Sequence, residues 1–229
     1  MTLNQASSPP MAPERALPWY QVWLKALTSP NVVTYESFVT RPGVSVGKAC
    51  LWVFLGATVG YAIAAAIRLA LGALGTIGQR GPGPMSNLAG SGLLLVCLVP
   101  VAGALSVVAL IIVSGFSHIL ASALGGNGTY AQLAYAMAAY TAPASLVTSA
   151  LSAVPVVGGC LGLPLGLYLI FLNVLAIKAV HHLTWARAIL SSAIFFVGLL
   201  VVLACFTIVA LALLGPAIGN VFSNIVIGI

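Results

Sequence analysis

The sequence predicts an all-α membrane protein, a bundle of five transmembrane helices preceded by a short N-terminal interfacial helix. Of the 229 residues, 61% are apolar and only 4% are Asp, Glu, Lys or Arg, whereas soluble domains carry roughly 25% charged residues. So little polar surface cannot cover a water-facing fold, and most of the chain is expected to face lipid. The chain also contains five long apolar stretches, each close to the roughly 20 residues that a helix needs to cross a bilayer.

Residues 1–44 are predicted to form a cytoplasmic tail and the interfacial helix. The Pro-rich start of the chain lacks the continuous apolar core of a cleavable signal peptide, so nothing indicates its removal. After it, "WYQVWLKALTSP" places Trp19 and Trp23 on one side of a helix of about three turns. A short helix with two tryptophans and one lysine is typical of the membrane surface.

Residues 45–215 are predicted to form the five-span membrane domain. The spans are expected near residues 49–71, 93–117, 130–154, 160–180 and 188–214. The third of them is rich in Ala, Ser, Thr and Tyr. The apolar tail over residues 216–229 is too short and too interrupted by Gly and Asn to cross again, so we expect it at the interface or against the bundle.

The distribution of basic residues predicts the orientation. With five spans, the region before the first span and the link between the fourth and fifth lie on one side, and they contain six of the eight Lys and Arg residues. The positive-inside bias therefore places the N-terminus in the cytoplasm and the C-terminus outside. The four tryptophans fall near the same interface: Trp19, Trp23, Trp52 and Trp185.

The absence of carboxylates from the spans limits the chemistry that the chain is expected to perform. No Asp or Glu follows Glu36, which argues against a carboxylate-driven proton or cation transporter and against an acid–base enzyme. The basic residues are too few and too dispersed for nucleic-acid binding, and the four cysteines have no paired spacing. We therefore expect neither catalytic activity nor a cofactor or metal site.

A polar stretch, "IKAVHHLTWARAI", separates the fourth and fifth apolar runs. Its side chains form the candidate interaction site on the cytoplasmic face: Lys178, His181, His182, Trp185 and Arg187. Together with His118, which is expected at the inner end of the second span, the two histidines raise the possibility of a metal site. Adjacent residues on a helix point about 100° apart, however, and no carboxylate or thiol is close in sequence. Polar residues that cap a helix C-terminus are the favoured interpretation.

Glycines at four-residue spacing predict close helix packing. They occur in the first span and at the start of the fourth: Gly56, Gly60, Gly158, Gly162 and Gly166. Such ridges let helix backbones approach closely in lipid, where apolar burial offers no drive. Packing within the chain is the default expectation, and dimerisation is the alternative.

Three segments in order resemble the Yip domain family, five-span proteins named for interacting with Ypt/Rab GTPases. They are "ESFVTRPGVSVGKACLWV", "GGNGTYAQLAYAMAAYTAPASL" and "PVVGGCLGLPLGLYLIFLNVLAIKAVHHLTWARAI". The similarity covers about residues 35–214, and in the last segment Val180, His181, Arg187 and Ala188 match the family pattern. In eukaryotes it would imply a Golgi or endoplasmic reticulum protein that assists vesicle traffic. The short, acid-poor N-terminal region is more similar to prokaryotic members, which implies a plasma membrane location and no transfer of GTPase binding.

The leading functional hypothesis is a non-enzymatic membrane scaffold or adaptor. Its expected partners are the lipid bilayer and other membrane proteins or a second copy of the chain. The alternative is a passive transporter or channel for a small neutral or anionic solute. Its path would be lined by polar side chains of the third span: Tyr135, Tyr140, Thr141 and Ser145.

Overall fold

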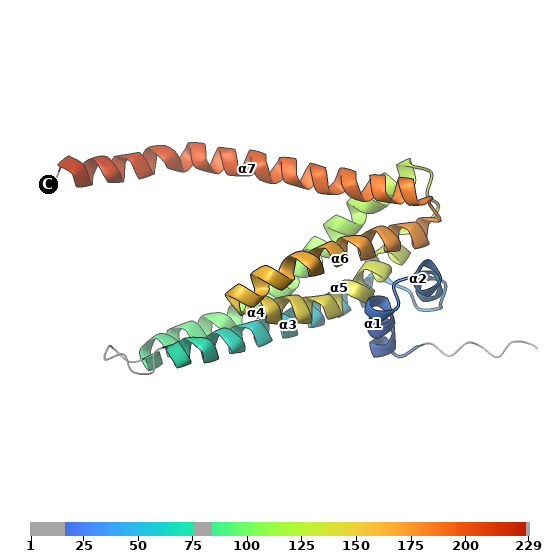
Figure 1. The fold of residues 1–229 in the computed structure, drawn as a ribbon, viewed down its shortest axis with the longest axis horizontal. Helices are drawn as coiled ribbons and strands as arrows, with labels where there is room; N and C mark the ends of the chain where they lie inside the picture. Colours follow the sequence, from blue (N-terminus) through green and yellow to red (C-terminus); the bar gives the residue numbers. More distant parts are fainter. Residues whose placement is uncertain (1–16, 76–83, 228–229) are drawn as a thin grey trace, which may run out of the picture.

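The computed structural model describes residues 17–75 and 84–227, and over these residues the protein is all-α. Its described helices are α1 Trp19–Thr28, α2 Val32–Val39, α3 Val46–Gly75, α4 Pro84–Ala123, α5 Tyr130–Ser152, α6 Pro155–His181 and α7 Trp185–Ile227. The five long helices, α3 to α7, run alternately away from and toward the end that carries α1 and α2 (Figure 1). The predicted tail over residues 1–16 lies outside the described residues.

Four segments of the described helices are long and apolar enough to cross a membrane: Val46–Leu71, Cys97–Ala123, Val156–His181 and Trp185–Gly215. They correspond to the first, second, fourth and fifth predicted spans. The predicted third span, α5, is not among them. Tyr, Thr and Ser interrupt the apolar residues of α5 and lower its mean hydropathy. By length and hydropathy, four of the five expected spans are therefore identified.

Helix α5 is the centre of the bundle. It packs between α3 and α6, and α1, α2 and α4 also contact it. Eleven of its side chains are buried, and six of these are alanines. Because alanine side chains are short, the neighbouring helix backbones can approach α5 closely. The helix predicted as the third span is therefore shielded by other helices over much of its surface.

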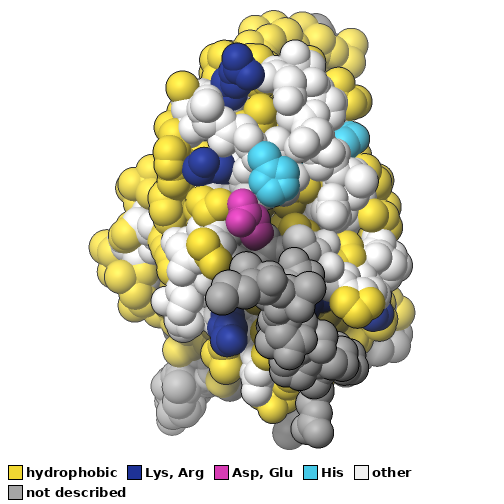
Figure 2. Space-filling model, turned by 90° about the vertical axis from the view of Figure 1, so that its right-hand side faces the viewer, with side chains coloured by type: hydrophobic (Ala, Val, Ile, Leu, Met, Phe, Trp, Pro, Cys, Tyr) yellow, Lys and Arg dark blue, Asp and Glu magenta, His cyan; other side chains and the backbone are white. Residues whose placement is uncertain are grey.

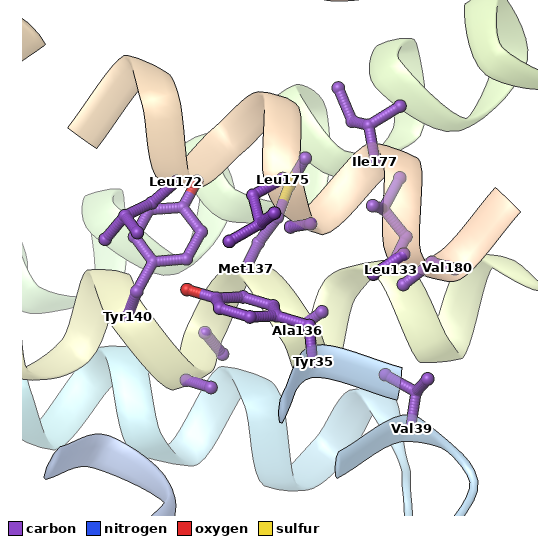
Figure 3. Packing of buried hydrophobic residues seen from close by; sticks show 14 of the residues in the cluster. Tyr35, Val39, Leu133, Ala136, Met137, Tyr140, Leu172, Leu175, Ile177 and Val180 are labelled. Carbon is purple, nitrogen blue, oxygen red and sulfur yellow. The ribbon is translucent and has the colours of Figure 1, made fainter. Parts of the chain in front are cut away.

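Helices α1 and α2 pack on this bundle and share its core. The phenol ring of Tyr35 on α2 is fully buried and lies near Met137, Tyr140 and Leu175 of α5 and α6 (Figure 3). Its hydroxyl donates to the carbonyl of Ala26 on α1 at 3.2 Å. Burial raises the pKa of the Tyr35 phenol well above its ordinary value, so the hydroxyl stays protonated and remains a donor.

Two further hydrogen bonds hold these short helices in place. The hydroxyl of Tyr168 on α6 donates to the carbonyl of Leu27 at the end of α1. The side-chain amide of Gln132 on α5 donates to the carbonyl of Val39 on α2 at 3.4 Å. The predicted N-terminal region and the predicted membrane domain, divided at residue 44, therefore meet in one continuous core.

Helix α7 diverges from the bundle and runs outward (Figure 1). Among the α7 residues up to 215, whose burial the structure describes, the buried ones lie near the start of the helix: Ala188, Ser191 and Ser192. Further along, an apolar cavity of about 590 Å³ lies between α4 and α7, with Phe116 and Phe195 in its walls. The helix continues past residue 215 as far as Ile227, so most of the tail predicted over residues 216–229 is an extension of α7.

Candidate functional site

The predicted interaction residues lie at the end of the bundle where two short loops meet. Residues 124–129 join α4 to α5, and residues 182–184 join α6 to α7. The N–H of Asn127 donates to the carbonyl of His181 at 3.4 Å, and Nη1 of Arg187 donates to the carbonyl of Leu124 at 3.3 Å. These bonds join the two loops, which are far apart in the sequence, into one surface, which we call the loop face.

The Gly-rich loop before α5 is shaped to fit against α6. Gly125 has a φ of +92°, and a Cβ on Gly128 would overlap the carbonyl of Val180. At the end of the loop, the N–H of Thr129 donates to Oε1 of Gln132 at 3.0 Å, and the N–H of Gln132 donates to Oγ1 of Thr129 at 3.4 Å. This capping box makes Thr129 the N-terminal cap of α5.

Two histidines from different helices form a hydrogen-bonded pair beneath the loop face. Nδ1 of His118 on α4 lies 3.0 Å from Nε2 of His181 on α6. His181 is only 1% exposed, and the ring of Tyr130 lies edge-on to His118 with 6.0 Å between centroids. One of the two facing nitrogens must donate and the other accept, so a single proton lies between them. The pair ties the end of α4 to the end of α6.

His182 points away from its neighbour. It ends α6 with a φ of 52°, in the left-handed region, which turns its side chain to the surface. Its ring is 62% exposed, and Nδ1 lies 3.5 Å from Oε1 of Glu36 on α2. Figure 2 shows a histidine beside an acidic side chain on this end of the molecule, with Lys and Arg side chains nearby. Glu36 is the only acidic residue in the described part of the chain.

The cation and the aromatic ring of the polar stretch also contact each other. Nζ of Lys178 donates to the carbonyl of Leu183 at 3.1 Å and lies 5.2 Å from the centroid of the Trp185 ring. A lysine near a helix C-terminus stabilises the unsatisfied carbonyls of the last turn. The Lys178 bond goes to a carbonyl in the loop beyond α6, so it holds that loop against the end of the helix.

The metal-site interpretation would need three imidazoles in one place, and His182 is turned away from the other two. No group of three or more His, Cys, Asp or Glu side chains within residues 17–75 and 84–227 is arranged to hold a metal ion.

A buried polar contact between α5, α6 and α7 was not anticipated from the sequence. Nδ2 of Asn173 donates to the hydroxyl of Tyr140 at 3.2 Å, and the hydroxyl of Ser192 donates to Oδ1 of Asn173 at 3.3 Å. All three side chains are buried. An amide inside an apolar run is the signal that points to such a contact, because an unpaired amide is costly in lipid.

The four polar residues of α5 named for a solute path do not converge. The hydroxyl of Tyr140 is buried against Asn173, whereas Tyr135 lines a cavity beside α1. Thr141 and Ser145 donate to carbonyls of their own helix, at 2.8 and 2.7 Å. These side chains support the packing of α5 and do not form one polar surface.

The predicted packing glycines have two different environments. A Cβ on Gly56 would overlap the backbone of Ala142, and one on Gly60 would lie 2.7 Å from the carbonyl oxygen of Ser145, so both allow α3 to approach α5. Gly158 lies in the same way against Leu151. A Cβ on Gly162 or Gly166 would meet no atom within 4 Å, so these two present an open face of α6.

Comparison with known proteins agrees with this all-α membrane architecture. No curated protein and no solved structure matches the chain. A family model described as the Yip1 domain matches residues 24–206, which include α2 to α6 entirely, the second half of α1 and the first half of α7. The matched region contains the loop face and the polar link between α6 and α7. The chain therefore belongs to the Yip1 domain family.

Proposed function

We propose that this membrane protein is a non-enzymatic scaffold whose loop face recruits a protein partner in the cytoplasm. The observation that carries the proposal is the structure of that face. Two loops and α2 are joined by Asn127, Arg187 and the contact between His182 and Glu36. A polar surface held by several contacts, at one end of an apolar bundle, gives a partner a preorganised target.

To recruit a cytoplasmic partner, the loop face must lie on the cytoplasmic side of the membrane. We therefore propose that the chain crosses the membrane five times, with the N-terminus in the cytoplasm. Helix α5 has 23 residues, which span about 35 Å at 1.5 Å per residue and exceed the roughly 30 Å hydrocarbon core. Because other helices surround it, α5 does not need the hydropathy of a lipid-facing span. If α5 is one of five crossings, the positive-inside bias places the basic loop face on the cytoplasmic side. Helix α1 then lies at the cytoplasmic interface, and the C-terminus lies outside. For a prokaryotic member the membrane is the plasma membrane.

The arrangement of α5 favours a scaffold over a solute carrier. Its centre is filled by buried alanines, Leu133 and Met137, and the hydroxyl groups of Thr141 and Ser145 donate to carbonyls of α5 itself. A transport path needs polar groups directed toward a common space. The polar side chains that link separate segments at the surface include Arg187, His182 and Glu36 of the loop face.

The orientation is tested by cysteine labelling in a variant whose four native cysteines are replaced by alanine. His182→Cys reports on the loop face, and Val156→Cys, exposed at the opposite end of α6, is the matched control. We expect an impermeant maleimide to label position 156 in intact cells and position 182 only after permeabilisation. Labelling of position 182 in intact cells would show that the orientation is wrong.

Partner recruitment is tested by site-specific photo-crosslinking in living cells. A benzophenone amino acid replaces His182 on the loop face or Val156 at the opposite end. We expect one discrete protein adduct from position 182 and none of the same mass from position 156. Adducts with lipid alone from position 182 would contradict a scaffold that recruits through this face.

A further inference from the structure

A separate feature lies at the end of the bundle opposite the loop face, where α3, α4 and α5 meet. It is a cavity of about 360 Å³, within the roughly 300–1,000 Å³ typical of small-molecule sites. Helices α3 and α4 lie side by side here (Figure 1). The cavity is distant from the loop face, so its role does not depend on partner recruitment there. Its described walls include one cation, one tyrosine and several apolar side chains: Arg68, Tyr61, Ala64, Ala65, Leu98 and Ala102.

The length of α3 places Arg68 near a membrane surface. Lys48, near the start of the helix, is exposed at the end of the molecule that carries α1 and α2. At 1.5 Å per residue, Lys48 and Arg68 are about 30 Å apart along the helix axis. That separation matches the thickness of the hydrocarbon core. With Lys48 at one interface, the guanidinium of Arg68 therefore lies at the headgroup level of the opposite leaflet.

Arg68 is anchored by one bond and retains donors for a ligand. Its Nη2 donates to the carbonyl of Ser152, the last residue of α5, at 3.3 Å. A guanidinium has five N–H donors, and the Arg68 side chain is exposed. The only carboxylate side chain among the described residues, that of Glu36, faces His182 at the other end of the molecule. A charged group at the edge of a bilayer favours a counter-charge, so the cavity selects an anion from outside the described chain.

The rest of the cavity is an apolar groove that runs from Arg68 toward the middle of the membrane. Tyr61 lies two turns before Arg68 on α3, which is about 10 Å along the helix axis. Between them, short alanine side chains keep the space between α3 and α4 open: Ala64, Ala65 and Ala102. Tyr61 is 39% exposed and Leu98 on α4 is 56% exposed. The groove is therefore open sideways, toward the lipid.

From these observations we infer that the cavity binds an anionic glycerophospholipid of the leaflet opposite the loop face. The phosphate accepts hydrogen bonds from Arg68, because a guanidinium is suited to phosphate geometry. One acyl chain follows the alanine-lined groove toward Tyr61. A soluble anion would use Arg68 and leave the apolar groove unfilled. The continuity of a cation at headgroup level with an apolar groove at acyl-chain level assigns the ligand to the bilayer.

The test measures lipid selectivity of the full chain, purified in mild detergent and stripped of lipid. Native mass spectrometry follows titration with phosphatidylglycerol or with phosphatidylcholine of the same acyl chains. We expect phosphatidylglycerol to bind several-fold more tightly. Arg68→Gln should weaken its binding about fivefold, the ratio that corresponds to one basic residue near an anionic lipid. Ala65→Leu fills the groove without a change of charge and should weaken the binding of both lipids.

The matched control is Arg187→Gln. Arg187 is also exposed and also donates to a backbone carbonyl at 3.3 Å, but it lies on the loop face and does not line this cavity. We expect this variant to bind phosphatidylglycerol like the original chain. Equal binding of the two lipids, no effect of Arg68→Gln, or an equal effect of Arg187→Gln would overturn the assignment.

Two competitors separate the bilayer lipid from other anions. Glycerol phosphate has the phosphate without acyl chains, and palmitate has an acyl chain with a carboxylate in place of the phosphate. We expect neither to displace phosphatidylglycerol at equal concentration. Displacement by glycerol phosphate would assign the cavity to a soluble anion, and displacement by palmitate would assign it to a fatty acid. Because Arg68 is exposed, its variant is expected to fold even if Ala65→Leu does not.

Discussion

The contact between α3 and α5 predicts opposite effects for two substitutions of the same kind. Gly56 lies against the backbone of α5, whereas Gly162 lies on an open face of α6. Both are helical glycines in apolar segments, so Gly56→Ala and Gly162→Ala add the same methyl group and differ only in what that group meets. The comparison isolates tertiary packing from helix propensity.

The expected size of the difference follows from the atoms around each Cβ. A Cβ on Gly56 would overlap the carbonyl oxygen of Ala142 and lie 2.9 and 3.0 Å from its carbonyl carbon and Cα. All three are backbone atoms that cannot rotate away, so we place the cost near the top of the usual range for overpacking, about 3 kcal/mol. Replacing a helical glycine by alanine stabilises the helix by up to about 1 kcal/mol because alanine has the higher helix propensity. Gly56→Ala should therefore destabilise the protein by about 2 kcal/mol, and Gly162→Ala should stabilise it slightly.

Reversible unfolding by sodium dodecyl sulfate in mixed micelles, followed by far-ultraviolet circular dichroism, measures both free energies of unfolding. We expect the midpoint of Gly56→Ala to fall at a lower detergent fraction than that of the original chain, and the midpoint of Gly162→Ala not to fall. Equal midpoints for the two variants would refute the close approach of α3 to α5 at Gly56. A loss of stability in Gly162→Ala would show that its face of α6 is covered.

Two further comparisons use the same unfolding measurement. Tyr35→Phe should lower the free energy of unfolding by about 1 kcal/mol, the usual contribution of one hydrogen bond. Tyr35→Ala should lower it by about 3–5 kcal/mol because a buried ring is removed. A Tyr35→Ala variant as stable as the original chain would show that α2 does not belong to the core. His181→Ala removes a buried partner of His118 and should cost about 1–3 kcal/mol. His182→Ala changes an exposed side chain and should stay within about 0.5 kcal/mol of the original; equal losses for the two histidines would contradict the buried pair.

The positions of the long helices could be predicted because each depends on a local apolar run. The predicted spans near residues 49–71, 160–180 and 188–214 lie within α3, α6 and α7. Helix α4 begins at Pro84, about two and a half turns before the predicted start near Leu93. Gly, Pro and Ser near its start are typical of a loop, which is why the prediction begins later. Helix boundaries depend on the local backbone, which composition describes poorly.

The environment of the N-terminal helices could not be predicted. Trp19 and Trp23 indicate a surface helix, and nothing in the eight residues of α2 shows that Tyr35 is fully buried. Its burial depends on a space between α5 and α6 that forms only when those helices pack. Deleting residues 1–44 would therefore also remove part of the core.

Part of the candidate site was visible in the sequence and part was not. The polar stretch from Lys178 to Arg187 stands out against apolar neighbours, and the structure places it on the loop face. The hydrogen bond between His118 and His181 was not predictable, because it depends on which side of α4 faces α6. The same holds for the cavity beside α1, which needs the turn at Gly43 and the wall that Tyr135 of α5 supplies.

By itself the sequence determined that this protein is an all-α membrane protein with a basic and aromatic end. Those properties follow from composition and from the order of apolar and charged residues, which are independent of how the helices pack. The tertiary structure alone decided which surfaces meet. Glycines at the same four-residue spacing are packed at Gly56 and open at Gly162, and adjacent histidines are buried at His181 and exposed at His182. Spacing places a residue on a helix face, and only the neighbouring helices decide whether that face is covered.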